Sequence, residues 1–97
     1  MKDVIYYNNL YDLYSNLLTD KQKNYFEDYY FNNLSLSEMA ENYNVSRNAI
    51  SKQLHNIVSK LIDYEERLQL FSKKNKLLEL FDMIDNDDLK KKLEDVI

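Results

Sequence analysis

The 97-residue sequence contains no glycine, proline, cysteine or tryptophan. Without glycine or proline, the tight turns of β-hairpins and sandwich corners lack their usual residues, so a β-rich fold is disfavoured. Without cysteine, disulfides and thiolate metal sites are excluded, and His55, the single histidine, cannot build a zinc site by itself. No apolar run approaches the length that crosses a bilayer. We therefore expect a protein without metal or cofactor that does not enter a membrane.

The residues that are present favour an all-α domain. Charged residues make up 31% of the chain, and leucine, lysine and glutamate are abundant. The first residues, MKDVIYYNNLYDLYSN, lack the basic start and apolar block of a signal peptide, so the expected location is the cytoplasm. The length suits one domain, which we place at residues 1–84, followed by a short helical tail at residues 85–97.

Two capping boxes predict helix starts in the first half of the chain. Residues 19–22 (TDKQ) and 35–38 (SLSE) each place a hydroxyl three residues before a glutamine or glutamate, so that side chains and backbone amides bond reciprocally. An earlier helix is expected to begin after Asp3. The second helix is expected to end near residues 32–33, two asparagines, because asparagine tolerates a positive φ.

Residues 34–54, LSLSEMAENYNVSRNAISKQL, have the pattern of a helix-turn-helix. Two short helices that cross closely need a small side chain at the crossing, and Ala40 provides it. Asn44 follows four residues later, where the chain must reverse with a positive φ. Val45 is then expected to point into the core, and Ser46 to cap the second helix.

An apolar heptad pattern runs on from this second helix without a stop. Its members are spaced four and three residues apart: Ile50, Leu54, Ile57, Leu61, Tyr64, Leu68 and Phe71. The pattern predicts one long helix whose first half packs on the domain and whose second half is free to contact another chain. We expect a homodimer or partner contact through a seam of Leu61, Leu68, Phe71, Leu78 and Phe81. The acidic segment 85–88 is expected to cap a last helix, from Leu89 to Ile97.

Charge is distributed unevenly along the chain, whose net charge is −4. Residues 1–45 carry three basic and seven acidic side chains, whereas residues 46–60 carry three basic and no acidic ones. If the second helix of the motif enters a groove, its early exposed residues reach bases and phosphates. The candidate binding residues are Arg47, Asn48, Ser51, Lys52 and His55. Three cations are few for a DNA-binding protein. The alternative to a binding site is therefore a helix face that is only exposed to water.

No catalytic constellation is evident in the sequence. A glycine-rich phosphate loop is impossible, and one histidine leaves few options for acid–base chemistry. We therefore expect a protein that is not an enzyme.

Four motifs together resemble the YlxM-type helix-turn-helix proteins, which look like region 4 of a sigma factor standing alone. The motifs are LLTDKQ, DYYFNNLSLSEMAE, NVSRNAI and DYEERLQLF, and the resemblance covers roughly residues 6–81. It implies a regulatory protein that associates with the signal recognition particle, with the particle's GTPase, its RNA or both as partners. It also implies that Arg47, Asn48 and Ala49 begin the recognition helix.

Two other functions stay open. The chain would be a DNA-binding transcription regulator if helix 46–60 reads the major groove. It would be a structural adaptor if it binds a protein through the apolar seam alone.

Overall fold

The structure is a computed structural model that describes residues 3–96. These residues form six α-helices, one short 3-10 helix and no strand, which confirms the predicted all-α fold class. The elements are α1 (Val4–Tyr14), the 3-10 helix (Ser15–Leu17), α2 (Asp20–Tyr30), α3 (Leu36–Tyr43), α4 (Arg47–Leu68), α5 (Leu70–Phe81) and α6 (Asp87–Glu94).

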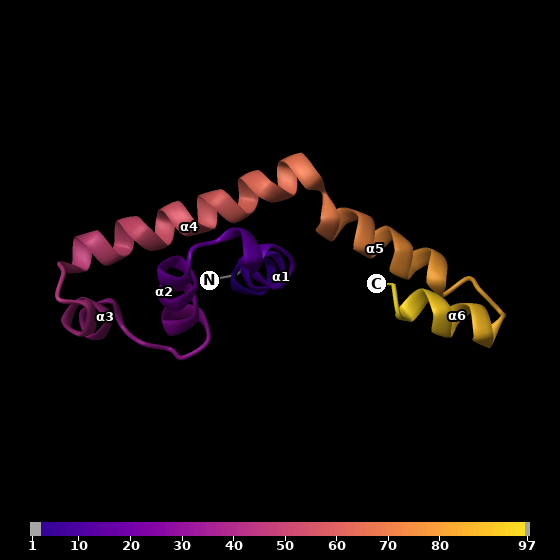
Figure 1. The fold of residues 1–97 in the computed structure, drawn as a ribbon, viewed down its shortest axis with the longest axis horizontal. Helices are drawn as coiled ribbons and strands as arrows, with labels where there is room; N and C mark the ends of the chain where they lie inside the picture. The colour runs from indigo at the N-terminus through magenta and orange to yellow at the C-terminus, as the bar shows by residue number, and fades with distance from the viewer. Residues whose placement is uncertain (1–2, 97) are drawn as a thin grey trace.

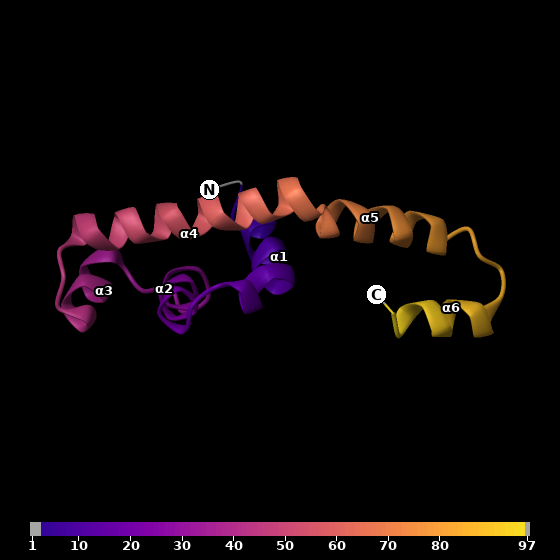
Figure 2. The same cartoon turned by 45° about the horizontal axis from the view of Figure 1, so that its top comes forward.

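The long helix α4 organises the molecule, which measures 55 × 25 × 25 Å. The three N-terminal helices lie along one side of α4, and α5 continues beyond its far end (Figure 1). Helix α6 then folds back beneath α5, as Figure 2 shows from a second direction. The helix-turn-helix and the α5–α6 pair therefore occupy opposite ends of an elongated chain.

The core lies between α4 and the N-terminal helices. Helix α4 contributes one buried apolar residue every three or four positions, as the heptad pattern predicts for its first half: Ile50, Leu54, Ile57 and Leu61. The other helices contribute mainly Leu10, Tyr11, Tyr14, Tyr25, Phe26, Met39 and Ala40. Removal of these side chains from water is the main force that holds the helices on α4.

Both predicted capping boxes are confirmed. The amide of Gln22 donates to Thr19 Oγ1 at 3.2 Å, and the amide of Thr19 donates to Gln22 Oε1 at 2.9 Å. The same reciprocal pair of bonds opens α3 at residues 35–38, at 3.0 and 3.1 Å. Asp3 precedes α1, but its side chain makes no capping bond. Asn33 has a φ of 57°, in the segment where α2 was predicted to end.

The turn between α3 and α4 forms as predicted, except for one side chain. Asn44 is left-handed, with φ 56° and ψ 47°, and Ser46 Oγ accepts a bond from the amide of Ala49 at 3.0 Å. The amide of Val45 donates to the carbonyl of Ala40 at 3.0 Å. The prediction that the Val45 side chain enters the core is wrong, because this side chain is 41% exposed. Backbone bonds close the turn, so the turn does not need the Val45 side chain in the core.

The prediction of one uninterrupted helix through residue 71 is also wrong. Gln69 adopts a left-handed conformation, with φ 55° and ψ 33°, and separates α4 from α5. The carboxylate of Glu65 explains the break, since it accepts bonds from the amides of Phe71 at 2.9 Å and Ser72 at 3.1 Å. It thereby caps α5 at the positive end of that helix.

Tyr14 completes this junction from α1. Its hydroxyl donates to Glu65 Oε1 at 2.7 Å and accepts a bond from the amide of Leu70 at 3.0 Å. Burial, followed by the bond to Glu65, raises the pKa of the Tyr14 hydroxyl. The spacing of apolar residues gives no information about this polar cluster. The heptad pattern therefore did not predict the break between α4 and α5.

The predicted seam is consequently divided between two places. Leu61 is fully buried in the protein's own core, so it is not available to a partner. Phe71 is half-buried and packs against that core. Leu68, Leu78 and Phe81 remain at least partly exposed on either side of the break.

The last helix begins two residues earlier than predicted. Asn86 caps it, because Asn86 Oδ1 accepts a bond from the amide of Leu89 at 3.1 Å, and α6 runs from Asp87 to Glu94. Ile97, the predicted end of this helix, lies outside the described residues.

Candidate partner-binding face of the helix-turn-helix

The candidate face is the N-terminal half of α4. Ser46 starts the helix, and α3 supports it from below, where Ala40 is only 8% exposed. The phenol of Tyr43 donates a hydrogen bond to the carboxylate of Asp28 and so ties α3 to α2. Burial, followed by this bond, raises the pKa of Tyr43 to about 12. The face is therefore held at one end of the molecule by a packed, hydrogen-bonded support (Figure 2).

The structure places all five predicted binding residues on the surface. They are Arg47, Asn48, Ser51, Lys52 and His55. Steps of four residues put positions 47, 51 and 55 in one stripe of the helix and positions 48 and 52 in the next. The five side chains thus share one exposed side of α4, while Ile50 and Leu54 anchor the other side in the core.

The surface beside these stripes is concave. One hollow is lined by Leu36, Ser46, Arg47, Asn48 and Ser51. A neighbouring hollow is lined by Tyr7, Tyr29, Tyr30, Leu36, Ser51, Leu54, His55 and Val58. Side chains of α1, α2 and α3 therefore take part in the surface that a partner would meet.

Sequence reasoning missed some members of this surface. Tyr29, Tyr30 and Leu36 come from α2 and α3, and only the fold brings them beside α4. Asn56 and Ser59 are exposed and lie four and seven residues after Lys52. Helical periodicity alone would have added these two to the candidate residues.

The electrostatics of the face are mildly positive. Lys60, the third basic residue of the acid-free stretch 46–60, is turned towards α2, where its Nζ lies 3.5 Å from Gln22 Oε1. Arg47 and Lys52 are the two side-chain cations among the five candidates, and the positive end of the α4 dipole lies beside Arg47. The face is thus a small positive area on a chain of net charge −4.

Residues 3–96 contain no cluster of metal ligands and no membrane-spanning helix. In that range no three histidine, aspartate or glutamate side chains converge in a way that holds a metal ion. Within the same range, no helix is both long and apolar enough to span a membrane.

A short helix joined by a left-handed turn to a second helix, which has an exposed polar start, defines a helix-turn-helix protein. Residues 1–97 match the family UPF0122, described as "Putative helix-turn-helix protein, YlxM / p13 like", and the chain belongs to this family.

Several UPF0122 proteins are similar over most of the chain. One from Ureaplasma urealyticum serovar 10 is 44% identical over 87 residues, which cover 90% of this chain and 88% of that protein. One from Fusobacterium nucleatum subsp. nucleatum is 48% identical over 90 residues, covering 92% and 86%. One from Lactococcus lactis subsp. cremoris is 47% identical over 75 residues, covering 74% and 68%. The expected resemblance to YlxM-type proteins is confirmed.

Proposed function

We propose that this chain is a non-enzymatic regulatory protein that associates with the signal recognition particle and contacts its RNA, its GTPase or both. Family membership supports the helix-turn-helix framework, and the resemblance to YlxM-type proteins supports the choice of particle. The observation that carries the proposal is the exposed, carboxylate-free start of α4 on an otherwise acidic chain. The contact residues are Arg47, Asn48, Ser51, Lys52 and His55.

The small number of cations favours a ribonucleoprotein over a long DNA duplex. Each phosphate that a protein neutralises contributes about −0.9 to the slope of log affinity against log salt on B-DNA. Arg47 and Lys52 would neutralise about two phosphates, against the roughly six to ten typical of tight DNA binding. A partner that adds protein contacts to a few phosphates compensates for this shortage. The acidic remainder of the chain suits a basic protein surface, mainly by aiding encounter and specificity.

A titration with reconstituted particle tests the assigned face. The double variant Arg47→Glu/Lys52→Glu is expected to bind roughly 10- to 100-fold more weakly, because phosphate attraction becomes repulsion. The matched control is Arg67→Glu/Lys91→Glu, which reverses one arginine and one lysine at exposed positions away from the face. Each pair of reversals takes the net charge from −4 to −8, so total charge is equal in the two variants. Equal binding by both double variants would show that the face is wrongly assigned.

A duplex-DNA regulator is the second candidate. Arg47, Asn48 and Ser51 stand at the start of the helix, where recognition helices contact base edges, and arginine pairs with guanine as asparagine does with adenine. This function predicts duplex binding that distinguishes sequences and weakens as salt rises from about 50 to about 200 mM. A mobility-shift assay on genomic fragments at these two salt concentrations separates it from particle binding.

A further inference from the structure

The C-terminal arm, residues 68–96, exposes much of its apolar surface. Eight of its large apolar side chains are between 42% and 81% exposed: Leu68, Leu70, Leu77, Leu78, Leu80, Met83, Leu89 and Val96. Neither α5 nor α6 contains a buried residue. An exposed apolar surface of this kind on a soluble chain marks an interaction site.

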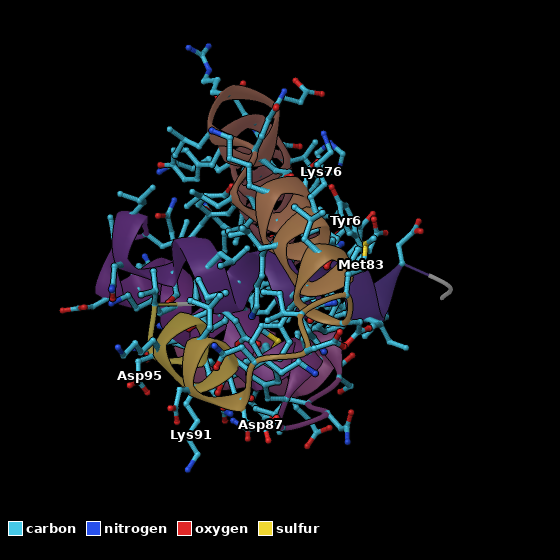
Figure 3. All side chains as sticks on the ribbon, turned by 90° about the vertical axis from the view of Figure 1, so that its right-hand side faces the viewer. Tyr6, Lys76, Met83, Asp87, Lys91 and Asp95 are labelled. Atoms are coloured by element: carbon cyan, nitrogen blue, oxygen red, sulfur yellow. The ribbon has the colours of Figure 1, made fainter. Side chains whose placement is uncertain are left out.

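A groove runs beside α5, between α1 and the residues that follow α6. Leu13, Leu70, Leu77 and Val96 line it, and Lys73 and Lys74 border it. Asp87, Lys91 and Asp95 lie along the side of α6 that is turned away from α5 (Figure 3). The polar side of α6 therefore faces outwards, and Val96, which follows this helix, lies at the groove beside α5.

The charges along α5 favour one kind of partner for the exposed apolar surface of the arm. Lys73, Lys74 and Lys76 lie in the first half of the helix, whereas Asp82 and Asp85 follow its end. If two α5 helices pair antiparallel about Leu78, positions 74 and 82 of opposite copies lie beside each other. The basic end of each α5 then lies beside the acidic end of the other, and a twofold axis makes this contact occur twice. A parallel pairing would instead place like charges beside each other. The surface is thus complementary to itself.

We propose that a second copy of this chain docks on the C-terminal arm, with the two α5 helices antiparallel. Leu77, Leu78 and Leu80 form the centre of the interface, and the Lys74–Asp82 pairs flank it. The two helix-turn-helix faces then lie at opposite ends of the dimer. This interface differs from the seam predicted from the heptad pattern, because Leu61 is excluded from it. The proposal does not depend on the proposed function.

Sedimentation velocity over about 1 to 100 μM chain tests the apolar centre. The parent is expected to form dimers, and Leu77→Glu/Leu80→Glu to weaken them by at least about 30-fold, because each chain would bury two carboxylates at the centre. Leu17→Glu is the matched control, since Leu17 is 49% exposed and lies outside the arm, whereas Leu77 is 47% exposed. A parent that stays monomeric, or a double variant that dimerises like the parent, overturns the proposal.

A charge exchange tests the antiparallel pairing. Lys73→Glu/Lys74→Glu and Asp82→Lys/Asp85→Lys are each expected to weaken their own dimers at low salt. An equimolar mixture of the two variants is expected to restore dimers, because every contact then joins opposite charges across chains. Mixing would not repair a local folding defect in either variant. The mixture therefore distinguishes a loss of folding from a loss of docking. Failure of the mixture to dimerise better than either variant alone refutes the antiparallel arrangement.

Discussion

Removal of the Tyr14 hydroxyl is expected to destabilise the junction between α4 and α5. Tyr14→Phe keeps the ring in the core and deletes the hydroxyl, which donates to Glu65 Oε1 at 2.7 Å and accepts from the amide of Leu70 at 3.0 Å. Tyr14 is 1% exposed and Glu65 is 9% exposed, so water has little access to replace these bonds.

The magnitude follows from the two bonds that are lost. A hydrogen bond to a charged group contributes about 1.5–3 kcal/mol net, and a neutral one about 0.5–1.5 kcal/mol. The free energy of unfolding should therefore fall by about 2–4 kcal/mol. For a chain of this size, a loss of about 2 kcal/mol lowers the melting temperature by roughly 8–16 °C.

Urea and thermal unfolding, followed by circular dichroism, measure this loss. Tyr64→Phe is the matched control, because its hydroxyl makes one exposed bond, to the carbonyl of Leu17 at 3.3 Å. The control should lose less than about 1 kcal/mol. A double-mutant cycle of Tyr14→Phe with Glu65→Leu, which removes the acceptor, should give a coupling energy of about 1–2 kcal/mol. The reasoning is refuted if Tyr14→Phe costs no more than Tyr64→Phe, or if the coupling is below about 0.5 kcal/mol.

Three further predictions concern the helix-turn-helix and its support. Asn44→Ala should lower the free energy of unfolding by about 1–2 kcal/mol, whereas Asn44→Gly should stay close to the parent in urea unfolding, because position 44 has a φ of 56°. Ala40→Leu should cost about 1–3 kcal/mol in the same assay, since a larger side chain is forced into the crossing of α3 and α4. Burial raises the pKa values of Tyr11 and Tyr43 to about 12. The unfolded chain loses these protons first, so stability should be intact below pH 10 and fall as pH rises from about 10 to about 12. Unfolding measured against pH checks this, and Tyr43→Phe should make the fall shallower.

The helix-turn-helix could be predicted from the sequence because it depends on interactions between residues close together in the chain. A capping box involves residues three positions apart, and the left-handed turn at Asn44 depends on one residue's own conformational preference. The exposure of Arg47 and Lys52 follows from helical spacing relative to Ile50 and Leu54. These features were predicted because each depends on a few neighbouring side chains.

Other features of the candidate face required the fold. Lys60 was counted with the basic stretch, but its Nζ lies 3.5 Å from Oε1 of Gln22, which is 38 positions away in the chain. The hollow beside Ser51 and His55 is completed by Tyr29, Tyr30 and Leu36. Spacing along one helix contains no information about which other helices border it.

The sequence by itself therefore determined the all-α class, the starts of α2, α3 and α4, the turn and the exposed start of α4, since these depend on short-range preferences and periodicity. The tertiary structure alone decided where α4 ends. The bond between Tyr14 and Glu65 joins residues 51 positions apart, and it places a carboxylate where it caps α5 instead of letting the helix continue. Leu61 is buried in the core before this junction, and the exposed apolar side chains of residues 68–96 lie beyond it as a separate surface.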